Sequence, residues 1–231
     1  LIYVAKCKFF KYNCLSNEYC MQIDQLKKLP NSFYTQKNVC SIAKNLLGKI
    51  LVTQFNETIT ACTIVETEAY NGIVDKASHS YKNRRTSRTE IMFANGGLTY
   101  VYLCYGMHHL FNVVTNTINQ PHAVLIRAGE PVFGIETMLQ RTGKTKADYN
   151  LTKGPGNLCK AMGINNTHNG LDISGNEIFI AQHSNSPKKQ SILTTKRIGV
   201  DYAQEDALLP YRFILANNLY VSGKKSQNIA V

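Results

Sequence analysis

The feature that most constrains the fold is a series of strand-like segments separated by turn residues. These segments cover residues 49–54, 58–70, 98–105, 110–115, 123–128, 178–181, 198–200 and 211–216. Gly106 separates two of them, which predicts a hairpin or a bulge at that point. Because many strands occur with few helices, we predict an α+β fold. We expect a single domain with a mostly antiparallel, curved, barrel-like β core and peripheral helices.

The helical segments are fewer and shorter. Apolar residues recur at helical spacing over 39–47, and Gly48 is a plausible C-cap. Pro131 precedes a second predicted helix that starts at Phe133, and residues 154–157 open a third over 158–162. Without a repeat or a linker that divides two cores, we expect one domain over residues 21–222.

The two ends of the chain differ from this domain. Residues 1–20 have no regular periodicity, lack the parts of a signal peptide and precede Met21. We expect them to be a non-native or disordered extension, and residues 223–231 to be a loose C-terminal tail.

The composition narrows the possible partners and compartments. With 26 Lys and Arg against 15 Asp and Glu, the formal net charge is +11. This excess suits nucleic acid, an anionic membrane surface or a phosphorylated ligand, and it also fits a merely basic soluble protein. Apolar runs are too short to span a membrane. The 7 Cys are scattered, which predicts reduced thiols in the cytoplasm, no secretion and no metal site.

Two carboxylates end the apolar segment 58–70. Since side chains alternate along a strand, Glu66 and Glu68 should share a face with Tyr70. For Glu66 we favour either an exposed strand end or a structural ion pair. For Glu68, which lies just before a basic loop, a general base is an alternative to those two roles.

Residues 71–92 form the basic loop, in which cations outnumber acids. Its charged residues are Lys76, Lys82, Arg84, Arg85 and Arg88, with Asp75 and Glu90. Such a loop either holds phosphates or is simply solvated. His79 lies within it, and a lone His is more often a structural hydrogen-bonding residue. Lys153, Gly154 and Gly156 at a helix start are further phosphate candidates, although Pro155 also fits an ordinary helix start.

Polar and aromatic residues interrupt three predicted strands. Tyr100 and Tyr102 should share one face of their strand, while Tyr105 stands beside Gly106 at the turn. Tyrosines can stack on bases, but each one taken alone is more typical of a strand core. Asn112 and Arg127 lie inside apolar runs, where a buried polar group needs partners.

Seven of these motifs occur together and in order. They are 65–70 (VETEAY), His79, 86–93 (TSRTEIMF), 100–107 (YVYLCYGM), Asn112, 124–131 (VLIRAGEP) and 154–159 (GPGNLC). Together they resemble the alkyladenine (3-methyladenine) DNA glycosylase family, over about residues 24–222. The resemblance implies a barrel-like antiparallel core and the removal of alkylated or deaminated purines from duplex DNA. The implied substrates include 3-methyladenine, 7-methylguanine, hypoxanthine and ethenoadenine.

The resemblance also implies a role for each site residue. Glu68 matches the general base that activates a water, and Arg127 matches a residue near that water. Tyr105 matches the residue that fills the place of the flipped nucleotide. The base pocket would consist of Tyr70 and His79 on one side of the base, Tyr102 on the other, and Asn112 as a selectivity residue.

Further implications concern the reaction and its partners. Because water is the nucleophile, we expect a monofunctional enzyme that leaves the abasic site uncut and uses no cofactor or metal. Phosphate contacts are expected at Arg84, Arg85, Arg88, Lys153, Gly154 and Gly156. The protein is expected to act on damaged duplex DNA as a cytoplasmic monomer without a membrane or an obligate protein partner, and with the nucleoid if the host is bacterial.

Two other functions remain open from the residues alone. One is a non-catalytic nucleic-acid-binding module with an aromatic stacking surface, in which Glu68 would be dispensable. The other is a hydrolase that acts on RNA or on free nucleosides, in which Tyr105 would be dispensable.

Overall fold

The computed structural model describes residues 26–182 and 191–223. Residues 1–20, together with residues 224–231 of the expected C-terminal tail, lie outside this range. Within it, mixed helices and antiparallel strands confirm the predicted α+β class. The strands are β1 Lys27–Lys28, β2 Ile50–Phe55, β3 Thr58–Tyr70, β4 Thr99–Cys104, β5 His108–Thr115, β6 His122–Phe133, β7 Ile178–Gln182, β8 Ile192–Thr195 and β9 Arg212–Leu215.

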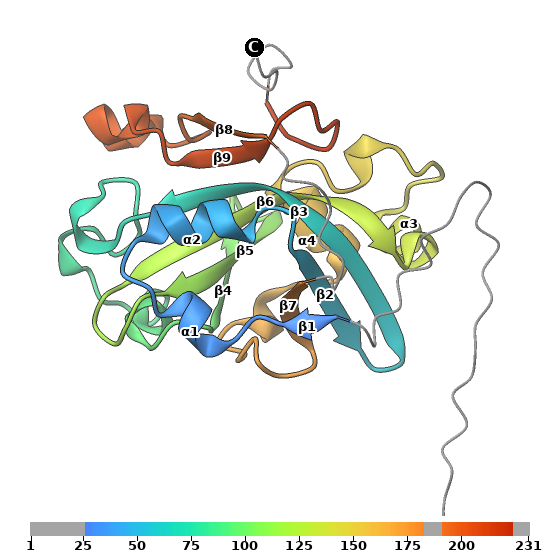
Figure 1. Ribbon diagram of the computed structural model, residues 1–231, viewed down its shortest axis with the longest axis horizontal. Coiled ribbons are helices and arrows are strands. Elements are labelled where there is room, and N and C mark those ends of the chain that lie inside the picture. Colours follow the sequence, from blue (N-terminus) through green and yellow to red (C-terminus); the bar gives the residue numbers. More distant parts are fainter. Residues whose placement is uncertain (1–25, 183–190, 224–231) are drawn as a thin grey trace, which may run out of the picture.

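The strands form one curved sheet in the order β1-β7-β2-β3-β6-β5-β4, with antiparallel neighbours throughout (Figure 1). The long strand β3 organises it: one edge pairs with β6, and the other pairs with β2 and then with β9. In the described residues no pairing joins β4 to β1. The predicted curved antiparallel sheet is therefore confirmed, but it stays open instead of closing into a barrel.

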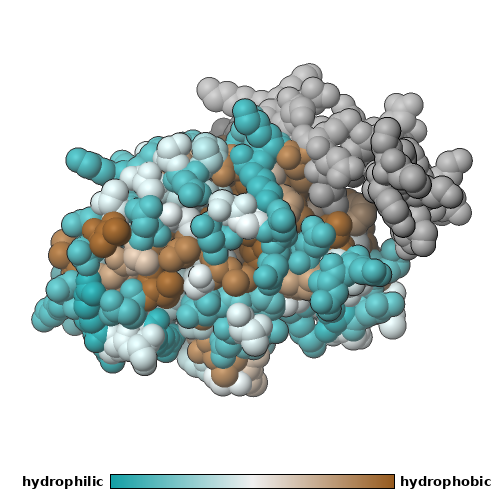
Figure 2. Space-filling model, turned by 90° about the horizontal axis from the view of Figure 1, so that it is seen from below, coloured by the Kyte–Doolittle hydropathy of each residue, from teal (hydrophilic) through white to brown (hydrophobic). Residues whose placement is uncertain are grey.

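Short helices pack on this sheet. They are α1 Asn31–Tyr34, α2 Val39–Leu46, α3 Ile135–Thr142 and α4 Pro155–Met162. At the start of α2, Asn38 accepts a hydrogen bond from the Ser41 amide at 3.0 Å, a typical N-cap. The apolar face of α2 is buried in the main core, which also takes in β3, β5, β6 and α4. Apolar side chains are not confined to the core, and some of them are visible in brown among hydrophilic ones in Figure 2.

One predicted helix begins later than expected, and one predicted strand is absent. The helix expected from Phe133 begins at Ile135, because β6 continues through Pro131 to Phe133. Pro131 pairs with Cys62 of β3 next to a register shift between Ala61 and Cys62, and a proline is tolerated at such an irregularity of the ladder. The expected strand 198–200 is a coil, in which Gly199 has a φ of 76°. The strand of this region is β8.

The basic loop between β3 and β4 is only partly irregular. It contains three short 3₁₀ helices, Gly72–Val74, Tyr81–Asn83 and Glu90–Phe93. Another 3₁₀ helix, Asp201–Leu208, precedes β9 and was not predicted. In Figure 1 this last helix and the β3–β4 loop lie on the same side of the sheet. They are joined by a hydrogen bond from the Lys76 amide to Asp206 at 2.8 Å.

Candidate active site

A cavity of about 810 Å³ opens between the β4–β5 hairpin, the basic loop, the start of α4 and the segment 198–202. Most of the predicted site residues line it. They are Tyr70, His79, Arg84, Arg88, Tyr102, Tyr105, Asn112, Arg127, Lys153, Gly154 and Gly156. The structure thus brings together residues that are up to 86 positions apart, from Tyr70 to Gly156. Of the predicted residues, Glu68 and Arg85 do not line the cavity.

Glu68 lies directly behind the cavity wall and is completely buried. Its Oε2 accepts a hydrogen bond from the Tyr70 hydroxyl at 2.9 Å and one from Arg127 Nη1 at 3.3 Å. The Ile198 amide donates to its Oε1 at 2.8 Å. Since Tyr70, Arg127 and Ile198 all line the cavity, the carboxylate is bonded directly to the cavity lining.

The neighbours of Glu68 have shifted pKa values that keep them as donors. Burial, followed by the Glu68 carboxylate, raises the pKa of Tyr70, so its hydroxyl keeps its proton. Burial alone would lower the pKa of Arg127, but Glu68 and Glu66 outweigh burial and raise it. Arg127 is therefore a fixed cation between two carboxylates.

Of the two roles predicted for Glu66, an exposed strand end and a structural ion pair, the structure shows the ion pair. Glu66 is not at an exposed strand end, since none of its surface is exposed. It forms ion pairs with Arg127 at 2.9 Å and with Arg212 at 2.7 Å. Burial alone would raise its pKa, but these two guanidinium groups and hydrogen bonds from Ser222 and Arg212 hold it below its ordinary value.

An aromatic group forms another wall of the cavity. The rings of His79 and Tyr102 meet edge to face at 4.8 Å, and His79 Nδ1 is hydrogen-bonded to the Tyr100 hydroxyl at 2.8 Å. Tyr100 and Tyr102 lie on the same face of β4, as predicted. Burial, followed by the charges of Arg88 and Arg84, lowers the pKa of His79 to about 4. His79 is therefore neutral at neutral pH.

This pKa makes stability depend on pH. Between the ordinary pKa of 6.5 and about 4, the unfolded chain protonates His79 while the folded protein does not. The folded state therefore loses stability as the pH falls through that window. Going from pH 7 to pH 5, we expect the wild type to lose about 1–2 kcal/mol more free energy of unfolding than His79→Gln, by the linkage of pKa to stability. Urea unfolding at both pH values measures the difference, and equal losses in the two proteins would contradict this assignment.

Tyr105 occupies the tip of the β4–β5 hairpin. It is 86% exposed and has a φ of 50°, which is unusual for a bulky side chain. Gly106 follows with a φ of 68°, so two successive residues in the left-handed region make the turn. The predicted hairpin at this glycine is thereby confirmed, and its turn projects an aromatic ring from the cavity rim into solvent.

Asn112 lies on β5 at the bottom of the cavity and is 3% exposed. Its Nδ2 donates to the Tyr100 carbonyl at 3.0 Å. This bond fixes the orientation of the side-chain amide, so the polar residue that interrupts an apolar strand has a defined place in the cavity lining.

The basic residues divide into two groups. Arg84, Arg88 and Lys153 line the cavity, and Arg88 stacks on Tyr102 with its guanidinium carbon 4.6 Å from the ring centre. Arg85 is instead engaged outside the cavity, where it pairs with Glu90 at 2.8 Å, contacts Asn119 and covers the ring of Phe93. The structure does not bring Arg85 together with the other predicted phosphate contacts.

Glycine is required at positions 154 and 156, at the start of α4, for two different local reasons. Gly154 is the N-cap with a φ of 87°, in the region that favours glycine. At Gly156, a Cβ would lie 2.9 Å from the ring of His108, so the close packing of β5 against α4 requires a glycine.

Three further residues at the site were not predicted from the sequence, of which two lie behind the cavity wall and one lines the cavity. Arg197 forms a buried ion pair with Asp75, and Arg212 on β9 pairs with Glu66. Tyr202, which is 65% exposed, lines the cavity from the 3₁₀ helix 201–208. Of these three, only Arg212 could have been singled out from the sequence, because it is an isolated cation at the start of the strand-like segment 212–215.

Within residues 26–182 and 191–223, there is no group of three or more His, Cys, Asp or Glu side chains arranged to hold a metal ion. In the same ranges, no helix has the length and apolar character required to cross a membrane.

Comparison with known proteins identifies the family of this chain. The model of the family described as "Methylpurine-DNA glycosylase (MPG)" matches residues 32–219. A protein of Desulfitobacterium hafniense is 45% identical over 206 residues, which cover 86% of this chain and 100% of that protein. One of Chlamydia felis is 47% identical over 188 residues, covering 81% and 95%, and both bear the name "Putative 3-methyladenine DNA glycosylase". The chain belongs to the methylpurine-DNA glycosylase family.

Proposed function

We propose that this DNA glycosylase flips an alkylated or deaminated purine nucleotide out of duplex DNA and hydrolyses its N-glycosidic bond with a water activated by Glu68. The single observation that carries the proposal is the position of Glu68. This buried carboxylate is bonded to Tyr70, Arg127 and the Ile198 amide, all of which line a cavity with an aromatic wall.

Three features of the cavity suit a flipped nucleotide: its aromatic side chains, its cations and the exposed Tyr105. Tyr70, His79 and Tyr102 supply faces and edges on which a purine stacks, while Arg84, Arg88 and Lys153 at the rim supply charge for phosphates. The exposed Tyr105 at the hairpin tip would enter the duplex and fill the place that the nucleotide leaves.

The chemical step needs one carboxylate. Water attacks C1′ of the deoxyribose, Glu68 takes a proton from that water, and the bond between C1′ and the base nitrogen breaks. The negative carboxylate also stabilises the positive charge that develops on the sugar. Arg127 and Tyr70 orient Glu68 by donating to the same oxygen, Oε2.

The substrates would include both charged and neutral lesions. 3-Methyladenine and 7-methylguanine leave readily because alkylation has made the base cationic, whereas hypoxanthine and ethenoadenine gain a proton as they leave. Asn112, fixed by its bond to the Tyr100 carbonyl, would disfavour the exocyclic amino group of normal guanine. Because the nucleophile is water, the abasic site stays uncut.

Partners and location follow from the same proposal. The enzyme would work as a monomer on damaged duplex DNA, in the cytoplasm and with the nucleoid in a bacterial host, without an obligate protein partner. A panel of defined duplexes, single strands and free nucleosides that carry each lesion tests this assignment. Release from duplexes supports it, while equal release from free nucleosides would favour a nucleoside hydrolase.

Tyr105 gives a prediction in which activity and stability separate. Tyr105→Gly should lower base release from duplexes at least tenfold, since the lost wedge no longer offsets an unstacking cost of a few kcal/mol. It should keep or raise the melting temperature, because glycine adopts a φ of 50° without strain. Single-turnover release and thermal unfolding measure the two effects. Unchanged release from duplexes would exclude the wedge role.

A further inference from the structure

Glu66 is a buried carboxylate that the proposed reaction does not use. It lies two residues before Glu68 on β3 and does not line the cavity. Four hydrogen bonds nevertheless converge on it in the described part of the chain. The donors are Arg127 Nε at 2.9 Å, Arg212 Nε at 2.7 Å, the Ser222 amide at 2.7 Å and the Ser222 hydroxyl at 2.8 Å.

Arg127 is shared between the two carboxylates. Its Nε donates to Glu66, its Nη1 donates to Glu68 at 3.3 Å, and its Nη2 donates to Ser222 Oγ at 3.4 Å. An Arg and a carboxylate usually form a fork with two parallel hydrogen bonds. Here Glu68 receives a single long bond from Nη1. Both possible forks need Nη2, together with either Nε or Nη1. Glu66 holds the Nε directly, and Ser222, which also donates to Glu66, accepts from Nη2.

The local backbone makes this sharing possible. The pairing of β3 with β6 shifts register on both sides of Glu66, between Ile64 and Glu66 and again between Glu66 and Thr67. Such irregularities redirect side chains. As a result Glu66 faces Arg212 of β9 and Glu68 faces the cavity wall, although both contact Arg127.

The charges in this group balance. Glu66 and Glu68 are matched by Arg127 and Arg212, and Arg212 is further fixed by Thr195 Oγ1 at 3.0 Å and the Ser222 carbonyl at 2.7 Å. If Glu66 were neutral, Glu68 would be the nearest carboxylate to Arg127, and a forked pair would become the favoured arrangement.

We infer that Glu66 is a positioning residue, which holds Arg127 by its Nε and so prevents a forked ion pair between Arg127 and Glu68. The inference rests on the proposed role of Glu68 as the general base. A forked Arg127 would add a bond to Oε1, the oxygen that accepts from the Ile198 amide and that would receive the proton from water, and would rotate the carboxylate away from the cavity.

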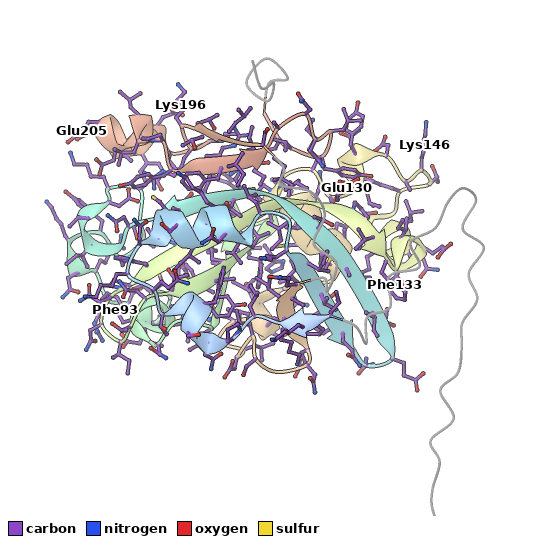
Figure 3. All side chains as sticks on the ribbon, in the orientation of Figure 1. Phe93, Glu130, Phe133, Lys146, Lys196 and Glu205 are labelled. Atoms are coloured by element: carbon purple, nitrogen blue, oxygen red, sulfur yellow. The ribbon has the colours of Figure 1, made fainter. Side chains whose placement is uncertain are left out.

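The first test replaces only the charge, with Glu66→Gln. We expect single-turnover base release to fall by about 10- to 100-fold, the usual consequence of a small misplacement of a reacting group. Affinity for a duplex with an abasic site should stay within about twofold, because Glu66 lies outside the cavity. The matched control is Glu130→Gln, which replaces a half-buried carboxylate on β6 that accepts from Asn218 at 2.8 Å (Figure 3). It should release base at the wild-type rate.

A second variant guards against a loss of folding. Glu66→Gln combined with Arg212→Met removes one charge of each sign, so the buried group stays neutral. We expect its melting temperature to exceed that of Glu66→Gln, while base release stays low. A melting temperature and a release rate that recover together would assign Glu66 a purely structural role and overturn the inference.

A third comparison tests the fork itself. A Lys at position 127 cannot form a fork, so Glu66→Gln should cost less than about threefold in an Arg127→Lys background. The same 10- to 100-fold cost in both backgrounds would overturn the inference. Its failure is distinct from that of the proposed function. A fully active Glu68→Gln variant would overturn the proposed role of Glu68 as the general base. An inactive Glu68→Gln variant together with a fully active Glu66→Gln variant would overturn the positioning role of Glu66 alone.

Discussion

Replacing Asp75 with alanine should lower the free energy of unfolding by about 3–5 kcal/mol, since it leaves a buried guanidinium without its counter-charge. Arg197 forms a forked pair with Asp75 at 2.5 and 2.9 Å, and the side chains are 0% and 1% exposed. The guanidinium also lies against the rings of Tyr70 and Tyr211, at 4.9 and 5.3 Å from their centres. Urea unfolding at neutral pH measures the loss.

A neighbouring ion pair is the matched control for Asp75. Lys76 and Glu205 are 2.6 Å apart, but their side chains are 28% and 68% exposed, and Glu205 lies at the surface in Figure 3. Glu205→Ala should leave the stability nearly unchanged, because exposed pairs are screened by solvent. If both variants lost the same stability, burial would not be the reason for the strength of the Asp75 pair.

The Asp75 pair also matters for the site. Arg197 immediately precedes Ile198, whose amide donates to Glu68, and its Nη1 donates to the Ala69 carbonyl at 3.0 Å. Asp75 therefore ties the basic loop to β3 and to the coil after β8. The coil that replaces the predicted strand 198–200 is what places the Ile198 amide against the carboxylate.

The sequence allowed much of the fold to be predicted, because local patterns are strong in the elements that matter. The apolar alternation of 58–70, the turn at Gly106 and the helical spacing of 39–47 correspond to β3, the β4–β5 hairpin and α2. Tyr70, His79, Tyr102 and Asn112 also lie on one cavity, as the family resemblance implied.

The remainder depended on contacts between distant segments, for which no local pattern exists. Arg212 reaches Glu66 only because β9 pairs with β3, and the separation along the chain is 146 residues. In the described residues the sheet stays open because β4 and β1 do not pair, and this pairing likewise depends on distant segments. Arg85 looked equivalent to Arg84 and Arg88 in sequence, yet Glu90 and Asn119 take it away from the cavity.

Glu68→Gln should reduce base release by about 10²- to 10⁴-fold, the range that general base catalysis contributes. The amide cannot take a proton from water or stabilise positive charge on the sugar. In the wild type the Ile198 amide and the Tyr70 hydroxyl donate to different oxygens of Glu68. Glutamine has a single oxygen and cannot accept both bonds in this arrangement, so some local rearrangement is expected. Binding to abasic-site duplexes should persist, because the cavity lining is unchanged.

The central claim is tested most directly by single-turnover release of hypoxanthine from a defined duplex, with wild-type protein and Glu68→Gln side by side. The account predicts release of the free base with an intact strand by the wild type, and a loss of at least 100-fold in the variant with abasic-site binding retained. A Glu68→Gln protein that releases hypoxanthine at the wild-type rate would contradict it.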